Sequence, residues 1–332
     1  MKKLAVFSVV AALAFVIISC GGSKKSSGPI VWKLAFNQSA DHPQAKALQK
    51  LSDDFFEATK GRYRIEVNPN ELLGDQKTSF ESVQNGTIQM AMLGNPVVEA
   101  AAPDFGLLAL PGLYDSPEHQ TAVFKSGILK DLFTASKDKH FIVLAAVHGG
   151  TRNVYAKKPV RSPADLKGMK IRVMQSKTML DVLNAMGANA VGMSQGEVYS
   201  AIQQGVLDGA ENNEVTFNDL KQYEVAPVYS YTRHFMMPDL LVINTETYNS
   251  LSPEDKAAFD KLIDQTIDVC FANFMGQIEK AKAEAAGKGA QFIDDFDSSV
   301  FKKNFEGLVK AFIGNNAVRR DLYNKIRATA KK

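Results

Sequence analysis

The segment DLKGMKIRVMQS, residues 165–176, predicts a turn followed by a short strand with an arginine at its centre. Ile171 and Val173 alternate with Arg172. A strand points alternate side chains to opposite faces, so Arg172 is expected on the face opposite Ile171 and Val173. Two interpretations of this guanidinium are open at this stage. It is either a solvated group on a strand surface or part of an anion-binding site.

The residues before this segment predict an α/β lobe. Residues 30–37 (IVWKLAFN), 63–69 (YRIEVNP) and 88–93 (IQMAML) have the composition of strands. A helical pattern opens at Pro43 and stops at Gly61, and a second helix ends at the Asn-Gly pair 85–86. Strands that alternate with helices at this spacing predict right-handed βαβ units and a mainly parallel sheet.

A second α/β series begins near residue 141. Residues 141–147 (FIVLAAV) predict a buried strand, and RNVYAKKPV predicts another that ends at Pro159. The S-x-x-D and S-x-x-E patterns that begin at Ser162 and Ser194 are capping boxes at helix starts. The chain therefore predicts two α/β lobes in series.

The C-terminal third is predicted to be largely helical. Ser252, Pro253 and Asp255 give an N-cap, a proline in the first turn and a capping residue, and the helical pattern then runs to about Gly287. At 1.5 Å per residue this helix is roughly 50 Å long, which is enough to brace both lobes. Residues 239–244 (DLLVIN), just before it, predict a strand that could belong to the first sheet.

The N-terminal residues predict a secretory signal. Lys2 and Lys3 precede an apolar run that is too short for a comfortable membrane span. The run ends in IISC at Cys20, which resembles a bacterial lipobox and implies cleavage before Cys20 and its acylation. The alternative is an ordinary cleavage site near Ser19 that leaves Cys20 free. Cys270 is the only other cysteine and lies in an apolar helical run, so we expect it to pack in the core without a disulfide.

Composition narrows the function. A chain of 332 residues favours two lobes, and 45% hydrophobic with 23% charged residues is ordinary for a soluble globular protein. The net charge of +3 falls to +1 if Lys2 and Lys3 are removed, which argues against nucleic acid as a partner. The sequence contains no H-E-x-x-H, G-x-S-x-G, Walker or G-x-G-x-x-G motif, and its five histidines lack metal-ligand spacing. We therefore expect neither an enzyme nor a bound metal or cofactor.

Three ordered segments between residues 150 and 213 carry a family resemblance: GTRNVYAKKPV, ADLKGMKIRV and MSQGEVYSAIQQGVLDGAEN. Together with KLAFN, NELLGDQ, ALPGLYDS and INTETYNSLSPEDKAAF, they resemble the DctP-like solute receptors of tripartite ATP-independent periplasmic (TRAP) transporters. The resemblance implies an α/β, two-lobed periplasmic-binding-protein fold with parallel or mixed sheets, a hinge and a long bracing C-terminal helix. The domain boundaries that we expect are a signal peptide at 1–19, a lipidated cysteine and linker at 20–29, lobe I at 30–149 plus 238–277, and lobe II at 150–237 plus 278–332.

The resemblance also implies the ligand contacts. Arg172 would bind the ligand carboxylate, Arg152 would assist, and Asn212 would orient or contact the same group. Six further positions would contact the rest of the ligand: Asn37, Asp75, Gln76, Gly94, Asn95 and Gln195. Asn212 could instead be a turn residue, and Asp75 could be a helix N-cap. With these motifs around it, the anion-site interpretation of Arg172 is favoured, because a planar guanidinium matches a carboxylate and stays charged in a partly dry site.

The implied function is capture of a small organic anion between two closing lobes, without chemistry, and its delivery to membrane TRAP permease subunits. A helical-repeat partner protein is a further possibility. The chain departs from the family at Asn213, where proline is common, and at Gly94, where sugar-acid receptors carry an acid. The absent side chain at Gly94 raises the alternative of a smaller or more apolar ligand. A receptor for another importer or sensor, and an extracytoplasmic enzyme, are the remaining alternatives.

Overall fold

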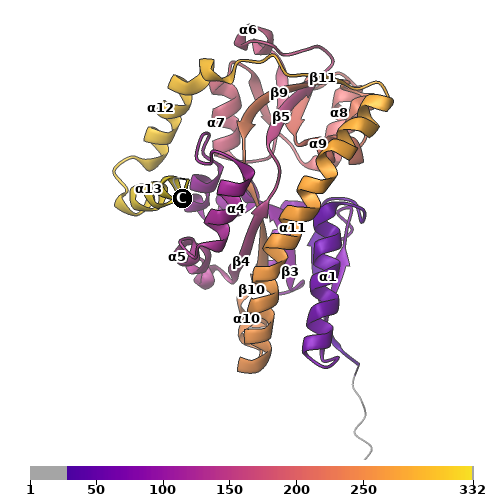
Figure 1. The fold of residues 1–332 in the computed structure, drawn as a ribbon, viewed down its shortest axis with the longest axis vertical. Coiled ribbons are helices and arrows are strands. Elements are labelled where there is room, and N and C mark those ends of the chain that lie inside the picture. Colours follow the sequence, from indigo (N-terminus) through magenta and orange to yellow (C-terminus); the bar gives the residue numbers. More distant parts are fainter. Residues whose placement is uncertain (1–27, 331–332) are drawn as a thin grey trace, which may run out of the picture.

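The computed structural model describes residues 28–330, which form two mixed sheets with helices packed around them (Figure 1). The predicted signal peptide and Cys20 lie outside the described residues. No helix within residues 28–330 is both long enough and apolar enough to span a bilayer.

The first sheet has five strands in the order β2-β1-β3-β10-β4. Their bounds are β1 Ile30–Phe36, β2 Tyr63–Asn68, β3 Met90–Gly94, β4 Phe141–His148 and β10 Pro238–Asn244. β1 pairs in parallel with β2 and β3, as predicted for βαβ units. β10 lies antiparallel between β3 and β4, so the prediction that residues 239–244 return to the first sheet is confirmed. The sheet is consequently mixed rather than mainly parallel.

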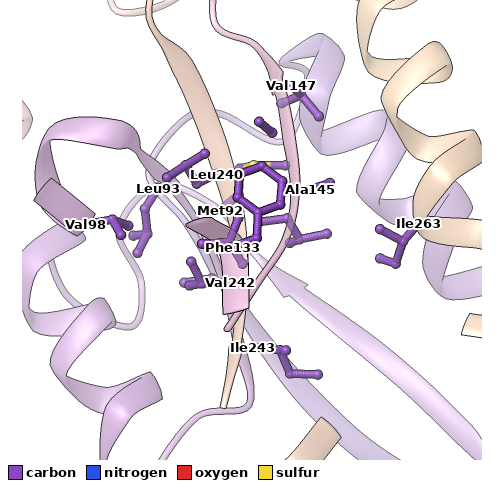
Figure 2. Packing of buried hydrophobic residues seen from close by; sticks show 14 of the residues in the cluster. Met92, Leu93, Val98, Phe133, Ala145, Val147, Leu240, Val242, Ile243 and Ile263 are labelled. Atoms are coloured by element: carbon purple, nitrogen blue, oxygen red, sulfur yellow. The ribbon is translucent and has the colours of Figure 1, made fainter. Parts of the chain in front are cut away.

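Helices cover this sheet and complete what we call lobe I. They are α1 (Pro43–Ala58), α2 (Gln76–Gln84), α3 (Asn95–Ala101), η1 (Pro103–Ala109), α4 (Pro117–Lys125), α5 (Lys130–Thr134), η2 (Lys137–Lys139) and α10 (Thr245–Asn249). The central strands read as continuous apolar runs because both faces of the sheet are covered. Figure 2 shows Met92, Leu240 and Ala145 from three neighbouring strands within this core.

The second sheet has six strands in the order β11-β9-β5-β8-β6-β7 and forms lobe II. Its strands are β5 (Arg152–Ala156), β6 (Lys170–Val173), β7 (Asn189–Gly192), β8 (Gly209–Asn212), β9 (Val228–Phe235) and β11 (Gln291–Ile293). Its helices are α6 (Pro163–Leu166), α7 (Lys177–Ala185), η3 (Gln195–Glu197), α8 (Val198–Gln203), α9 (Glu214–Asp219) and η4 (Gln222–Glu224). β6, which carries Arg172, lies between β8 and β7 and pairs in parallel with both.

The long predicted helix is α11, Pro253–Gly287, with Ser252 as its N-cap. It packs on α1 and β4 of lobe I and on α9 of lobe II, so it braces both lobes (Figure 1). Cys270 is fully buried on α11 within the lobe I core, as the sequence predicts.

The C-terminal segment, η5 (Ser298–Phe301), α12 (Lys302–Ile313) and α13 (Ala317–Thr329), divides between the lobes. α12 packs on α7 of lobe II, whereas α13 returns to α4 and η1 of lobe I. Ile326 of α13 is fully buried in the lobe I core, and Arg327 forms an ion pair with Asp115. The sequence prediction assigned all of 278–332 to lobe II; the structure differs for α13, because the apolar face of this helix is buried on lobe I.

Candidate functional site

Two adjacent cavities lie between the lobes, and both are lined by residues of lobe I and lobe II. The larger has a volume of about 260 Å³, and the smaller, of about 20 Å³, has room for little more than one water molecule. Gln76, Met174 and Gln195 line both and separate them. The two cavities are therefore parts of one cleft.

The lobes also touch beside the larger cavity through Glu99 of α3. Its carboxylate accepts hydrogen bonds from the Ser176 hydroxyl at 2.8 Å and from the Thr178 hydroxyl at 2.6 Å. Both partners belong to the N-terminus of α7 in lobe II, where an acid is favoured by the exposed N–H groups of a helix end. This contact ties the lobes together in the arrangement seen here.

Arg172 is 1% exposed and lines the larger cavity, so it is not a solvated strand residue. Its Nε donates to the Met193 carbonyl at 2.8 Å and its Nη1 to Gln195 Oε1 at 3.2 Å. Within residues 28–330, its Nη2 has no hydrogen-bond partner and no carboxylate forms an ion pair with it. Burial lowers the pKa of Arg172 to about 10, so the side chain remains charged at neutral pH. A buried cation without a counter-ion beside a cavity is suited to receive an anion.

Gln195 and Asn212 lie next to this arginine. Gln195 is 8% exposed. Its Oε1 accepts hydrogen bonds from Arg172 Nη1 and, at 3.4 Å, from Asn212 Nδ2. Its Nε2 has no hydrogen-bond partner among the described residues. Asn212 ends β8 and lines the smaller cavity, so it is more than a turn residue. The next residue, Asn213, caps α9 and donates to the Gly149 carbonyl, which explains why asparagine serves where proline was expected.

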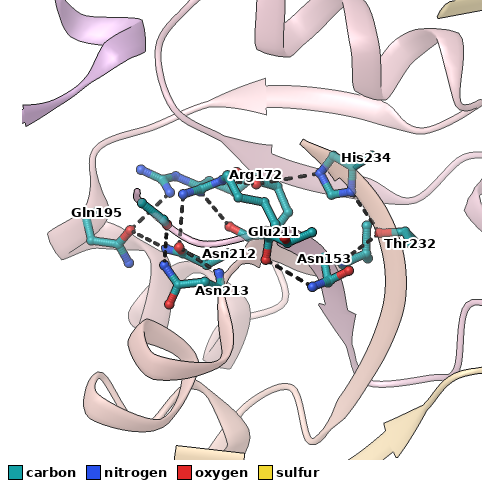
Figure 3. Close-up of polar contacts among 12 residues, drawn as sticks. Asn153, Arg172, Gln195, Glu211, Asn212, Asn213, Thr232 and His234 are labelled. Atoms are coloured by element: carbon teal, nitrogen blue, oxygen red, sulfur yellow. Dashed lines mark hydrogen bonds and ion pairs between the residues drawn. The ribbon is translucent and has the colours of Figure 1, made fainter. Parts of the chain in front are cut away.

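Arg152 is buried and already paired with Glu211, which is labelled within the polar network of Figure 3. Its guanidinium forms a two-pronged ion pair with Glu211 of β8, and its Nη1 donates to Asn212 Oδ1 at 2.9 Å. Burial opposes the Arg152 charge, but the pairing with Glu211 outweighs burial and raises the pKa of Arg152. Its charge is thus neutralised, and its clearest action is to hold Asn212 in place.

The same network continues to His234. Its Nε2 lies 3.6 Å from Glu211 Oε2, and its Nδ1 lies 2.8 Å from the Thr232 hydroxyl. Burial lowers the pKa of His234 despite the neighbouring carboxylate. Glu211, His234 and Thr232 were not predicted as site residues, and they support Arg152 from behind the cleft.

On the lobe I side, Gln76 begins α2 and its Oε1 accepts from the Gly94 backbone N–H at 2.8 Å. Both residues line the smaller cavity, together with Asn37 from the end of β1. The space next to Gly94 is filled from the other lobe: a Cβ there would lie 2.5 Å from Met174 Cε. Glycine at this position thus lets Met174 of the other lobe approach the backbone closely, and a larger residue would have to displace the flexible end of that side chain.

Two predicted contacts have structural roles. Asp75 caps α2 by accepting from the Thr78 N–H at 2.8 Å, although it also lines the larger cavity. Asn95 is fully buried and donates to the Phe105 carbonyl, and it lines neither cavity. Asn95 therefore lies behind the cleft wall rather than within it.

Other lining residues were missed by sequence reasoning. The larger cavity adds Glu71 and an apolar wall that includes Phe80, Val97, Ala100 and Met174, and the smaller adds Gln38, His42, Thr216 and Asp239. Asn70 and Glu71 form a left-handed turn, with φ of 57° and 56°. No glycine and no turn motif predicts this turn. In the sequence, these two residues are the first two of the NELLGDQ segment, one of the segments that carry the family resemblance.

Within residues 28–330, no group of three or more His, Cys, Asp and Glu side chains could hold a metal ion. His42 and His148 are buried, and burial lowers their pKa values to about 3 and about 4, so both are neutral at pH 7. His42 accepts a hydrogen bond at the start of α1 through Nδ1, which is a structural use.

Comparisons with known proteins agree with this geometry. The profile of the family described as bacterial extracellular solute-binding protein, family 7 (DctP), matches residues 34–315. The protein YiiZ of Salmonella typhimurium is 30% identical over 337 residues, which cover 99% of this chain and 98% of that protein. The 2,3-diketo-L-gulonate-binding periplasmic protein YiaO of Escherichia coli is 31% identical over 227 residues, 68% of this chain and 69% of that protein.

Solved structures extend the comparison. A TRAP periplasmic solute binding protein from Anaerococcus prevotii, with D-glucuronate bound, has a TM-score of 0.87 and 32% identity, covering 91% of this chain and 98% of that one. One from Bradyrhizobium, in complex with D-galacturonate, has a TM-score of 0.87 and 27% identity, covering 90% and 100%. These similarities confirm the predicted two-lobed α/β fold and the predicted resemblance: the chain belongs to the DctP family of TRAP periplasmic solute-binding proteins.

Proposed function

We propose that this protein is an extracytoplasmic receptor that binds the carboxylate of a small organic acid through Arg172 and delivers the acid to a TRAP permease. One observation carries the proposal. Arg172 is a buried cation with a free nitrogen and no counter-ion within residues 28–330, and it faces a cavity between two lobes. A carboxylate there would accept charge-assisted hydrogen bonds and neutralise the buried charge.

A sugar acid is the first candidate ligand. The related structures hold glucuronate or galacturonate, and YiaO is named for binding 2,3-diketo-L-gulonate. All three ligands are carboxylates that carry several oxygens. In this chain the amide groups of Gln195, Asn212 and Gln76 would contact the carboxylate and neighbouring oxygens, while Arg152 would act by positioning Asn212.

A second candidate is an organic acid with a larger apolar part. Phe80, Val97 and Met174 line one wall of the larger cavity, and Gly94 supplies no polar group. A volume of about 260 Å³ is slightly below the roughly 300–1,000 Å³ typical of pockets for drug-sized ligands, so either candidate must be small.

The proposed role requires no chemistry. The family is one of receptors, and the cleft offers an arginine and amides rather than a paired nucleophile and base. An extracytoplasmic enzyme would convert candidate acids to products of different mass on incubation. A receptor for another importer or a sensor would lack two membrane permease genes beside its own gene.

The place of action is extracytoplasmic, as for the periplasmic relatives. Acylation of Cys20 would anchor the protein to a bacterial membrane, since several acyl chains hold stably where one binds only marginally. The partners would be the two permease subunits, and a helical-repeat protein in some systems. Cys20→Ser should release the protein from the membrane fraction or leave the signal uncleaved; a variant that is processed and retained like the wild type would refute the anchor.

The direct test of the proposed function is mass spectrometry of the small molecule released when purified protein is denatured. A carboxylic acid that rebinds to wild-type protein in calorimetric titration, and fails to rebind to Arg172→Ala, supports the proposal. Release of a compound without a carboxylate, or equal binding by the two proteins, contradicts it.

A further inference from the structure

Glu71 adopts a backbone conformation that glutamate rarely uses. It follows Asn70 in the turn after β2, and both have positive φ, 57° and 56°. Asparagine tolerates this left-handed region, but for glutamate it is unfavourable. The turn is held by hydrogen bonds from the Asn70 N–H to the Gln38 carbonyl and from the Glu71 N–H to the Phe36 carbonyl. A strained backbone that the surroundings enforce is a frequent mark of a functional residue.

The Glu71 side chain lies at the cleft between the lobes. The side chain lines the larger cavity together with Arg172, and its Oε2 lies close to Gly196 of lobe II, where a Cβ would be only 3.0 Å away. Its Oε1 is buried and has no hydrogen-bond partner among the described residues. Gln195, 92% buried, presents an unpaired Nε2 in the wall of the same cavity. Both residues thus line the larger cavity, and each carries a buried polar atom without a partner among the described residues.

The charges around Glu71 disfavour its ionised form. Burial raises the pKa of Glu71, and the nearby Asp75 and Glu197 raise it further, while Arg172 opposes them. A carboxylate in this setting gains from a hydrogen-bond donor on a ligand, because no donor of residues 28–330 reaches its Oε1.

We propose that Glu71 is a specificity-determining residue that accepts a hydrogen bond from a hydroxyl or ammonium group of the ligand, a few atoms away from the carboxylate that Arg172 binds. This inference rests on the proposed function and narrows it: the ligand is an acid that carries its own donor. Plain carboxylates of the same shape bind weakly, because they leave the buried Oε1 unpaired.

Three ring acids test this assignment by calorimetric titration of wild-type protein, Glu71→Met and Arg172→Met. D-glucuronate carries hydroxyl donors, pipecolate carries an ammonium, and cyclohexanecarboxylate carries neither. We expect at least one donor-bearing acid to bind wild-type protein at least tenfold more tightly than cyclohexanecarboxylate. Its affinity should fall about 10- to 150-fold in Glu71→Met, while the affinity for cyclohexanecarboxylate stays the same or rises. Which of the two donor-bearing acids binds identifies the donor.

A second measurement needs no ligand. Glu71→Gly relieves an unfavourable left-handed residue and should raise the melting temperature by roughly 1–4 °C, whereas Asn70→Gly, at a residue that tolerates this region, should leave the melting temperature close to that of wild type. Asn70 is exposed and lines neither cavity, so Asn70→Gly should bind the donor-bearing acid as wild type does, whereas Glu71→Gly should lose that binding. If Glu71→Gly melts well below wild type while Asn70→Gly melts as wild type does, Glu71 is a structural residue and the assignment is overturned.

The remaining outcomes separate this inference from the proposed function. If cyclohexanecarboxylate binds wild type as tightly as the donor-bearing acids, and Arg172→Met loses it, Glu71 has been misassigned while Arg172 still binds a carboxylate. If none of the three acids binds wild type, the assignment of Glu71 to a donor-bearing ring acid is overturned, and the mass of the co-purified molecule decides the proposed function by itself.

Discussion

Replacing Arg172 with methionine should strongly weaken acid binding without destabilising the unliganded protein. Burial lowers the pKa of Arg172 from 12.5 to about 10, which corresponds to roughly 3 kcal/mol of penalty on the charged form. Arg172→Met removes this penalty and keeps most of the side-chain volume. It leaves the Met193 carbonyl without its donor, at a cost of about 1–3 kcal/mol, while Gln195 Oε1 keeps the donor from Asn212. The two effects nearly cancel, so the melting temperature should stay the same or rise.

Binding responds differently, because the ligand carboxylate loses its only cation in the larger cavity apart from the exposed Lys77. Losing one partner of a desolvated charge pair costs about 2–5 kcal/mol, so affinity should fall roughly 30-fold to several thousand-fold. Calorimetric titration and thermal melting measure both quantities on the same samples.

Lys170→Met is the matched control for this prediction. Lys170 lies two residues away on β6, is exposed and lines neither cavity, so its loss removes the same charge from the same strand. Its affinity for the acid should remain within about twofold of wild type, since exposed charges interact weakly. Normal binding by Arg172→Met, or a large fall in its melting temperature, would refute the charge argument.

Three further predictions follow from the lobe contacts and the buried histidines. A bound acid should favour the closed arrangement and reduce the radius of gyration in solution scattering; an unchanged profile at proven saturation contradicts the hinge. Glu99→Ala removes the contact with Ser176 and Thr178, so the unliganded protein should expand and bind the acid a few-fold more weakly, and equal scattering by variant and wild type would exclude a closing role for Glu99. Burial holds the pKa values of His42 and His148 at about 3 and about 4, below the 6.5 of the unfolded chain, so the unfolded state takes up protons first. The free energy of unfolding, measured in urea, should therefore be highest above pH 6.5 and should fall as the pH drops toward 4. His42→Gln should make this pH dependence weaker. A free energy of unfolding that does not change with pH in the wild type would contradict neutral buried histidines.

Elements whose signals are local were predictable from the sequence. The Ser252-Pro253 start of α11 needs only neighbouring residues to be recognised, and the helix spans Pro253–Gly287 as expected. Residues 239–244 were predicted as a strand that could belong to the first sheet, and β10 does lie between β3 and β4. β9 and β11 were not predicted. β9 is buried along nearly its whole length and so shows no clear alternation of apolar and polar residues, and β11 is only three residues long.

The site residues also divide into features that the sequence predicts and features that it does not. The alternation of Ile171 and Val173 with Lys170 and Arg172 predicted which face of the strand carries Arg172, but only the family resemblance favoured an anion site over a solvated group. The ion pair between Arg152 and Glu211 was not predictable from the sequence, because Glu211 lies 59 residues later in the chain, on a different strand. Asn95 and Gly94 are adjacent in sequence, yet one faces away into the core and the other faces the cleft, a distinction that depends on how α3 begins.

The contrast between the two arginines gives the physical reason why one chain can keep two buried cations side by side. Arg152 has a full counter-ion in Glu211, so its charge is neutralised whether or not a ligand is present. Arg172 donates only to neutral acceptors, the Met193 carbonyl and Gln195. Burial lowers the pKa of Arg172, whereas pairing with Glu211 raises the pKa of Arg152. A ligand anion therefore gains little at Arg152 and much at Arg172. The Arg152–Glu211 pair holds Asn212, which donates to Gln195, so a carboxylate bound at Arg172 as we propose would meet donors whose positions are already set.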